Sequence, residues 1–159
     1  MNATKKLTLT KEQSLPKIKQ YCAYQERAHQ EVKDKLYEYG LHKKDVEEIL
    51  STLIEENYLN EQRFATQFAG GKFRMKQWGR QKIKYALKQK QVSDYCIKKA
   101  MATIDGEDYI STLTKLAEQK LRTLKSEKNI FIKKRKLRDH LMQRGFESDL
   151  INEIVLKNI

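Results

Sequence analysis

The segment most suited to chemistry, residues 70–90, is rich in lysine and arginine. It holds eight basic residues and no acid. Three aromatic residues are interleaved with the cations: Phe73, Trp78 and Tyr85. Cations bind phosphates or acidic protein surfaces, and an aromatic face gives a nucleic-acid base a place to stack. The segment therefore predicts a binding surface. The competing interpretation is a solvated helix face whose lysines serve solubility.

A helix that begins near Arg80 would position part of this surface. Ile83 and Leu87 would face the core, while Arg80, Lys84 and Lys88 recur at i, i+4 steps along the flank. Trp78 is expected to pack, clamping the loop that precedes this helix. The spacing thus predicts a stripe of cations beside a buried face.

A second basic run, residues 133–136 with Arg138, opens a later helix. Cations near a helix N-terminus oppose the helix dipole, which favours a binding role over a stabilising one. The predicted partner- or nucleic-acid-binding residues are Lys72, Arg74, Lys76, Arg80, Lys82, Lys84, Lys88, Lys133, Lys134, Arg135 and Arg138.

Patterns typical of catalysis are missing from the sequence. His29, His42 and His140 stand apart, with no HExxH motif and no cysteine–histidine cluster. No P-loop, GxGxxG or GxSxG motif occurs. The adjacent acids at 47–48 and 55–56 are typical of a solvated helix face. We expect no enzyme activity, no metal site and no cofactor.

The net charge of +12 is spread unevenly along the chain. Residues 1–61 carry −1, residues 62–104 carry +10 and residues 105–159 carry +3. Charges of one sign packed into the middle third repel one another and destabilise the fold. A polyanionic or acidic partner would compensate, so we expect the partner to bind there.

Bulk composition limits the class of protein. Of 159 residues, 39% are hydrophobic and 34% are charged, which supports modest cores rather than one large core. No stretch is apolar enough to span a membrane, and the first residues do not resemble a secretory signal. Cys22 and Cys96 form no CxxC motif, so we expect two free thiols and a cytoplasmic protein.

Three segments of the chain repeat one another, with offsets of 51 and 54 residues. The corresponding apolar positions are Val32, Ile83 and Leu137, then Leu36, Leu87 and Leu141, then Leu41, Val92 and Phe146. The turn after the first helix holds Gly40, Gln91 or Gly145. Glycine adopts the left-handed conformation at a helix end at little cost, so Gln91 should form a strained or differently shaped turn.

Each copy has a further helix upstream, beginning near Pro16, Asn60 or Asp108, with Asn60 and Asp108 as N-caps. We therefore predict an all-α fold: a tandem array of three three-helix repeats, elongated and curved. The predicted divisions are a flexible N-terminal arm at 1–13, repeat 1 at 14–57, the strongly basic repeat 2 at 58–106 and repeat 3 at 107–159.

Helix pairs joined by glycine turns also occur in helix-turn-helix proteins, so base-reading DNA recognition is a further possibility, although such pairs are common in all-α folds.

The repeat order and motifs together resemble those of the RecX regulatory proteins, modulators of the RecA recombinase. The first unit matches through residues 31–36 and Gly40, the second through Arg63-Phe64-Ala65, Gly79, Ile83, Leu87 and Val92, and the third through Leu137, Leu141, Gly145-Phe146 and Ile151. The chain departs from the family pattern at Gln25, Ala28, Asn60 and Gln91.

The resemblance implies a monomer without a cofactor that binds the groove of the RecA filament on single-stranded DNA. There it would inhibit filament extension, strand exchange and co-protease activity, and so regulate DNA repair and the SOS response. Two alternatives stay open: a stand-alone DNA-binding protein acting through its basic middle repeat, and a purely structural adaptor.

Overall fold

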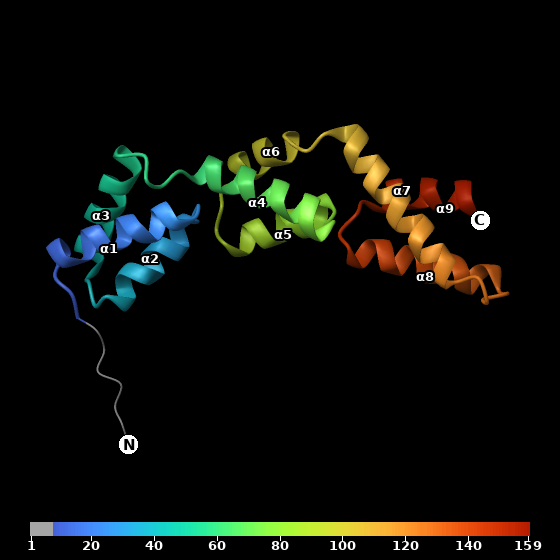
Figure 1. Ribbon diagram of the computed structural model, residues 1–159, viewed down its shortest axis with the longest axis horizontal. Coiled ribbons are helices and arrows are strands. Elements are labelled where there is room, and N and C mark those ends of the chain that lie inside the picture. Colours follow the sequence, from blue (N-terminus) through green and yellow to red (C-terminus); the bar gives the residue numbers. More distant parts are fainter. Residues whose placement is uncertain (1–7) are drawn as a thin grey trace, which may run out of the picture.

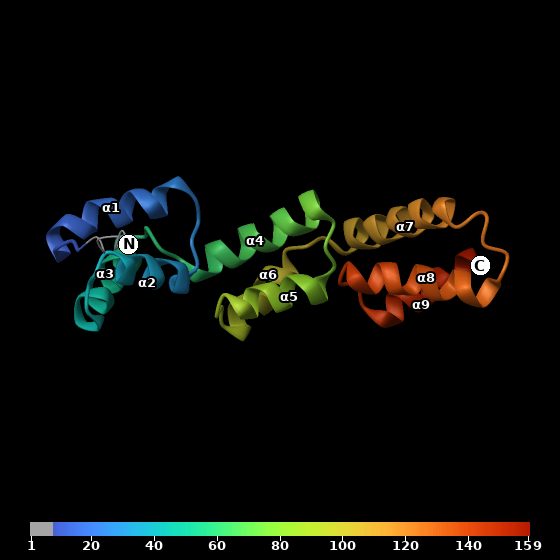
Figure 2. The ribbon, with the colours of Figure 1, turned by 90° about the horizontal axis from the view of Figure 1, so that it is seen from below.

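The computed structural model describes residues 8–159, which form nine α-helices and no β-strand. In chain order these are α1 (Lys11–Tyr24), α2 (His29–Glu38), α3 (Lys43–Glu55), α4 (Glu61–Lys76), α5 (Arg80–Gln89), α6 (Asp94–Ala102), α7 (Gly106–Thr123), α8 (Ile130–Gln143) and α9 (Ser148–Asn158). Figures 1 and 2 show α1–α3, α4–α6 and α7–α9 as successive groups in a row. The predicted all-α, elongated array of three three-helix repeats is confirmed.

Helix α1 begins inside the segment predicted as a flexible arm, residues 1–13. Residues 1–7 lie outside the described part of the chain. Beyond them, the Leu9 N–H donates to the Tyr39 carbonyl at 2.8 Å. Thr10 and Gln13 form a reciprocal capping box, which fixes the helix start at Lys11. Residues 9–13 thus belong to the folded structure and not to a flexible arm, because capping and a backbone hydrogen bond tie them to repeat 1.

Side-chain caps begin the first helix of the other repeats as well. Asn60 caps α4 by accepting from the Arg63 N–H at 2.8 Å, as the sequence predicted. The predicted cap at Asp108 is wrong, because Asp105 accepts from the Asp108 N–H at 2.9 Å and α7 begins three residues earlier. Both residues are aspartates in a plausible position, so the sequence alone did not separate them.

The turn between the second and third helices has the same shape in all three repeats. Gly40, Gln91 and Gly145 have φ values of 86°, 62° and 95°. The next residue donates its N–H to the carbonyl five positions earlier in each case: Leu41 to Leu36, Val92 to Leu87 and Phe146 to Leu141. Of the two outcomes predicted for Gln91, the structure shows the strained turn: the shape is the same as in the other repeats, and a residue with a side chain is strained in this conformation.

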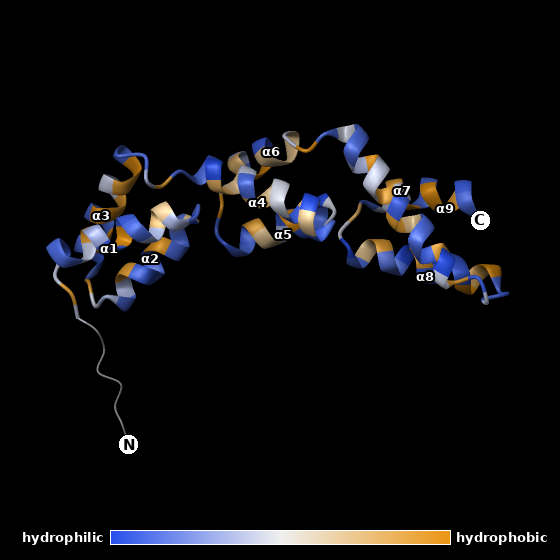
Figure 3. Cartoon of the chain, viewed as in Figure 1, coloured by the Kyte–Doolittle hydropathy of each residue, from blue (hydrophilic) through white to orange (hydrophobic). Residues whose placement is uncertain are grey.

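Buried side chains form two separate cores. One contains residues of repeat 1, among them Ile18, Leu36 and Leu53, together with Leu59 from the segment that leads into α4. The other runs through repeats 2 and 3 without interruption. Figure 3 shows hydrophilic and hydrophobic stretches alternating along the helices, as expected where each helix buries one face. The array therefore consists of a single repeat joined to a continuous two-repeat body.

Candidate functional site

The middle repeat holds two lysines against its tryptophan. Helix α4 ends at Gln77, which takes a left-handed conformation with φ 55°, and the chain then turns into α5. Trp78 lies in this turn and packs against the core, so the predicted packing role is confirmed. The Nζ atoms of Lys72 and Lys82 lie 5.0 and 4.6 Å from the centre of its ring. We call Lys72, Trp78 and Lys82 the Trp78 cluster.

Further contacts between lysines and an aromatic ring lie along α4, between the Trp78 cluster and repeat 1. Lys72 Nζ also lies 5.4 Å from the ring centre of Phe68. Lys90 Nζ lies 6.0 Å from the same ring and forms an ion pair of 2.8 Å with Glu31. Neither Phe68 nor Lys90 was among the predicted site residues, although the i, i+4 spacing of Phe68 and Lys72 could have indicated their contact.

The remaining predicted cations of repeat 2 are less constrained, with one exception. Arg74 and Lys76 are exposed in the last turn of α4, and Lys84 is half-buried on α5. None of the three forms an ion pair with a described residue. Lys88 is exposed and lies 4.0 Å from Asp94. The exception is Arg80, whose guanidinium is occupied within the fold.

Arg80 joins repeat 2 to repeat 3. Its Nη1 atom forms an ion pair of 2.9 Å with Glu147, and its guanidinium lies 3.8 Å from the ring centre of Tyr109. The Arg80 N–H donates to the Tyr109 hydroxyl at 3.0 Å, and that hydroxyl donates to Glu147. Burial, with the Glu147 hydrogen bond, raises the pKa of Tyr109. No local sequence pattern predicts this role, because the two partners lie far from Arg80 along the chain.

The second basic run lies on another repeat. Lys133, Lys134 and Arg135 follow the first turn of α8, and Arg138 donates from Nε to Asn152 at 3.1 Å. Figures 1 and 2 agree that α2, α5 and α8 follow one side of the array. The helices that carry this run and the α5 cations therefore belong to different repeats but lie on the same side of the array.

The described residues offer no support for metal or membrane chemistry. No group of three or more His, Cys, Asp or Glu among residues 8–159 could hold a metal ion. No helix in this range is long and apolar enough to cross a membrane. Cys22 and Cys96 are buried free thiols, and burial raises the pKa of Cys22 to about 11, which keeps it protonated and unreactive.

Comparison with known proteins identifies relatives for most of the chain. A model of the second three-helix domain of RecX matches residues 60–101, and a model of the third matches residues 107–155. The regulatory protein RecX of Clostridium perfringens (strain 13 / Type A) is 35% identical over 130 residues, covering 81% of this chain and 60% of that protein. The chain thus spans about three fifths of this relative's length.

Two further relatives match along most of their length. The regulatory protein RecX of Prosthecochloris aestuarii is 30% identical over 133 residues, covering 84% of this chain and 85% of that protein. The crystal structure of RecX from Lactobacillus salivarius has a TM-score of 0.84 and 24% identity, covering 92% of this chain and 95% of that one. The comparison with the Lactobacillus salivarius structure shows that the two chains share a fold.

Proposed function

The chain belongs to the RecX family of regulatory proteins, and from this premise we propose that it regulates the RecA recombinase without catalysing a reaction. It would bind the groove of the RecA–DNA filament as a cytoplasmic monomer. There it would inhibit filament extension, strand exchange and co-protease activity, and thereby regulate DNA repair and the SOS response. The observation that carries the proposal is the family match over repeats 2 and 3.

The shape and charge of the molecule support this proposal. Three repeats in a row present several weak contact sites, and linkage raises the effective concentration for each contact after the first. The excess of +10 lies in residues 62–104, and helices α5 and α8, which carry many of the predicted cations, lie on one side of the array. A filament groove exposes acidic protein surface and DNA phosphates, so binding should weaken as salt increases.

Direct binding to DNA is the second candidate function, and the same +10 charge favours it. The two candidates differ in what they require of the target. A filament regulator needs the surface of RecA, whereas a stand-alone DNA-binding protein needs only the nucleic acid.

Binding to bare single-stranded DNA and to RecA-coated DNA at moderate salt separates the two candidates. We expect tighter binding to the coated DNA. Equal or tighter binding to bare DNA would exclude the filament-regulator proposal and favour the second candidate.

A charge-reversal variant tests the α5 surface, using Lys84→Glu with Lys88→Glu. Arg80 is left intact, because its reversal would remove the contacts to Glu147 and Tyr109. We expect loss of inhibition of the RecA ATPase with unchanged helical content by circular dichroism. The matched control reverses Lys125 and Lys157, two exposed lysines of repeat 3 without an ion pair to a described residue. A folded variant that inhibits normally would assign the α5 stripe to a solvated face.

A further inference from the structure

The two ammonium groups of the Trp78 cluster have no acidic partner among the described residues, unlike Lys90 and Arg80, and they share one aromatic ring. Lys90 is paired with Glu31 and Arg80 with Glu147, but neither Lys72 nor Lys82 forms an ion pair with any described residue. Instead, both ammonium groups lie over one indole ring, at 5.0 and 4.6 Å from its centre. The ring attracts the cations through its quadrupole and leaves their charge uncompensated.

The backbone on both sides of the ring is fixed by neighbouring elements. The Trp78 N–H donates to the Lys72 carbonyl at 3.2 Å, which ties the turn to the end of α4. The Gln81 N–H donates to the Gly145 carbonyl at 2.9 Å, and a Cβ on Gly145 would lie only 2.3 Å from the Cβ of Lys82. The backbone and Cβ of Lys82 thus pack closely against repeat 3.

Fixed positions reduce the entropy cost of binding an anion. A free lysine side chain loses about 2 kcal/mol of rotamer entropy when it is immobilised. The indole already restricts both side chains of the cluster, so less of this freedom is left to lose. A pair of cations held in place without a counter-ion is arranged to receive negative charge from outside the chain.

We propose that the Trp78 cluster is a phosphate-binding site for the backbone of single-stranded nucleic acid. Both cations of this cluster are lysines, which bind phosphate as point charges and do not require the planar two-point geometry of arginine. A nucleic-acid strand brings phosphates close enough together to reach both ammonium groups. The inference deepens the proposed function, on which it rests, by naming the chemical group that the basic repeat contacts on a DNA-containing filament.

The cluster contacts the strand without reading its sequence. The ammonium groups lie over the indole ring and so compete with a base for stacking on it. Phosphate contacts set position and affinity but carry no sequence information. Oligonucleotides of equal length and different sequence should therefore bind with similar affinity.

The test is a titration of a fluorescently labelled oligothymidylate with the full chain over a series of salt concentrations, read by anisotropy. The double variant Lys72→Gln with Lys82→Gln should bind at least tenfold more weakly. Its slope of log affinity against log salt should be shallower by about 1.4, because two phosphate contacts are lost from a single strand. The control Lys125→Gln with Lys157→Gln removes the same charge elsewhere and should behave as the unmodified chain.

A second readout reports from the site itself. Trp78 is the single tryptophan of the chain, so its fluorescence should change as DNA is added. An unchanged slope in the double variant would overturn the inference. So would loss of binding to RecA-coated DNA with undiminished binding to bare DNA, because the cluster would then contact protein carboxylates. If the unmodified chain failed to inhibit RecA, the proposed function would fail, while the bare-DNA titration would still decide the inference.

Discussion

At the junction between repeats 2 and 3, buried apolar side chains of both repeats meet in one core, whereas repeat 1 keeps a core of its own. Tyr109 illustrates the difference: it is fully buried, with the rings of Phe73 and Phe146 at 5.8 and 5.2 Å. Backbone groups cross the same junction, since the Gly79 N–H donates to the Arg144 carbonyl at 2.7 Å. Apolar burial and backbone hydrogen bonds do not depend strongly on salt.

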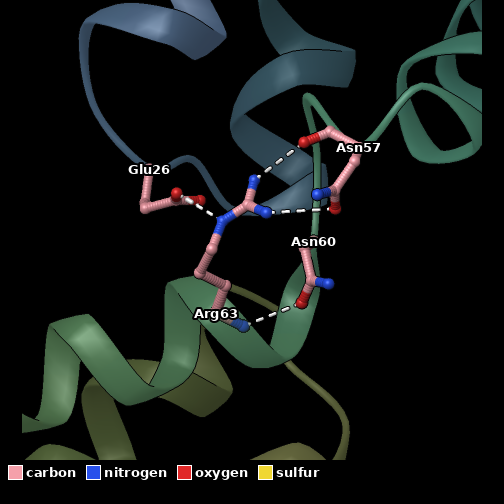
Figure 4. A network of polar contacts seen from close by, with 4 residues as sticks. All are labelled: Glu26, Asn57, Asn60 and Arg63. Atoms are coloured by element: carbon pink, nitrogen blue, oxygen red, sulfur yellow. Dashed lines mark hydrogen bonds and ion pairs between the residues drawn. The ribbon is translucent and has the colours of Figure 1, made fainter.

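The junction between repeats 1 and 2 is mainly polar. Figure 4 shows Arg63 of α4 reaching Glu26, while its Nη atoms donate to the side chain and carbonyl of Asn57, each at 3.1 Å. Lys90 pairs with Glu31, and Ala28 alone enters the larger core from repeat 1. The side chains of Glu26 and Arg63 are 20% and 33% exposed, and such pairs contribute about 0–1 kcal/mol each. Repeat 1 should therefore separate from the rest of the array more easily than repeat 3.

The largest effect is expected from Gly79→Ala at the second junction. The added Cβ would lie 2.4 Å from backbone atoms of Gly145 and Phe146, and backbone cannot move aside as a side chain can. Overpacking of this kind should lower the free energy of unfolding by about 3 kcal/mol, measured by urea denaturation.

Gly71→Ala is the matched control for this variant. Gly71 lies in α4, and a Cβ there would meet nothing within 4 Å. It should stabilise the helix by about 0.5–1 kcal/mol. Equal stability of the two variants would contradict the close approach of repeats 2 and 3.

Tyr109→Phe should have the next largest effect. It keeps the ring but removes the hydroxyl that accepts from the Arg80 N–H and donates to Glu147. Leaving these partners unsatisfied should cost about 2 kcal/mol in the free energy of unfolding. Tyr95→Phe, at a tyrosine 65% exposed, is the control and should change little. A negligible cost for Tyr109→Phe would show that the apolar contacts alone hold this junction.

Glu26→Gln with Glu31→Gln should loosen the first junction at a smaller cost, about 1 kcal/mol or less in global stability. The measurement is the rate of limited proteolysis in two segments: 56–60, which connects repeat 1 to repeat 2, and 25–28, the α1–α2 loop that contains Glu26. We expect faster cleavage there, and the cleavage rate of the unmodified chain should rise towards this value at high salt because partly exposed ion pairs are partly screened. Cleavage that is faster at residues 103–105 instead would reverse the ranking of the two junctions.

Acid should produce the smallest effect, again at the first junction. Burial lowers the pKa of His29, and Lys33 lowers it further. The nearby Glu61 has the opposite effect of raising this pKa, which is smaller than the effect of burial. The neutral ring is favoured in the folded chain, so this contribution is complete above the unfolded pKa of about 6.5 and is lost as the pH falls below it.

His29→Gln should therefore reduce the loss of stability between pH 7.5 and pH 5, measured by urea denaturation at both values. Part of the acid sensitivity should remain because of His140 in α8. Burial lowers the pKa of His140 as well, and Lys120 and Arg144 lower it further. A variant with the full acid sensitivity of the unmodified chain would rule out a contribution from His29.

Local patterns predicted much of this architecture and part of the candidate site. Asn60 was identified as a cap and Trp78 as a packing residue, since both depend on neighbours a few positions away. The error at Asp108 and the unforeseen role of Arg80 have different origins. Two aspartates competed for one cap, whereas no local pattern connects Arg80 with Glu147.

The sequence by itself determined the helices, their threefold repetition and the shape of the three turns, because apolar spacing and helix-end chemistry act over a few residues. Gln91 takes the same left-handed conformation as Gly40 and Gly145 despite its side chain, so even there the repeat pattern prevailed. Only the tertiary structure decided which cations are free to bind. Arg80 and Lys82 lie two positions apart on one helix, yet the fold brings Glu147 to the first and an indole ring to the second. A carboxylate neutralises its partner and an aromatic ring does not, which is why one residue holds the repeats together and the other is left with its charge uncompensated.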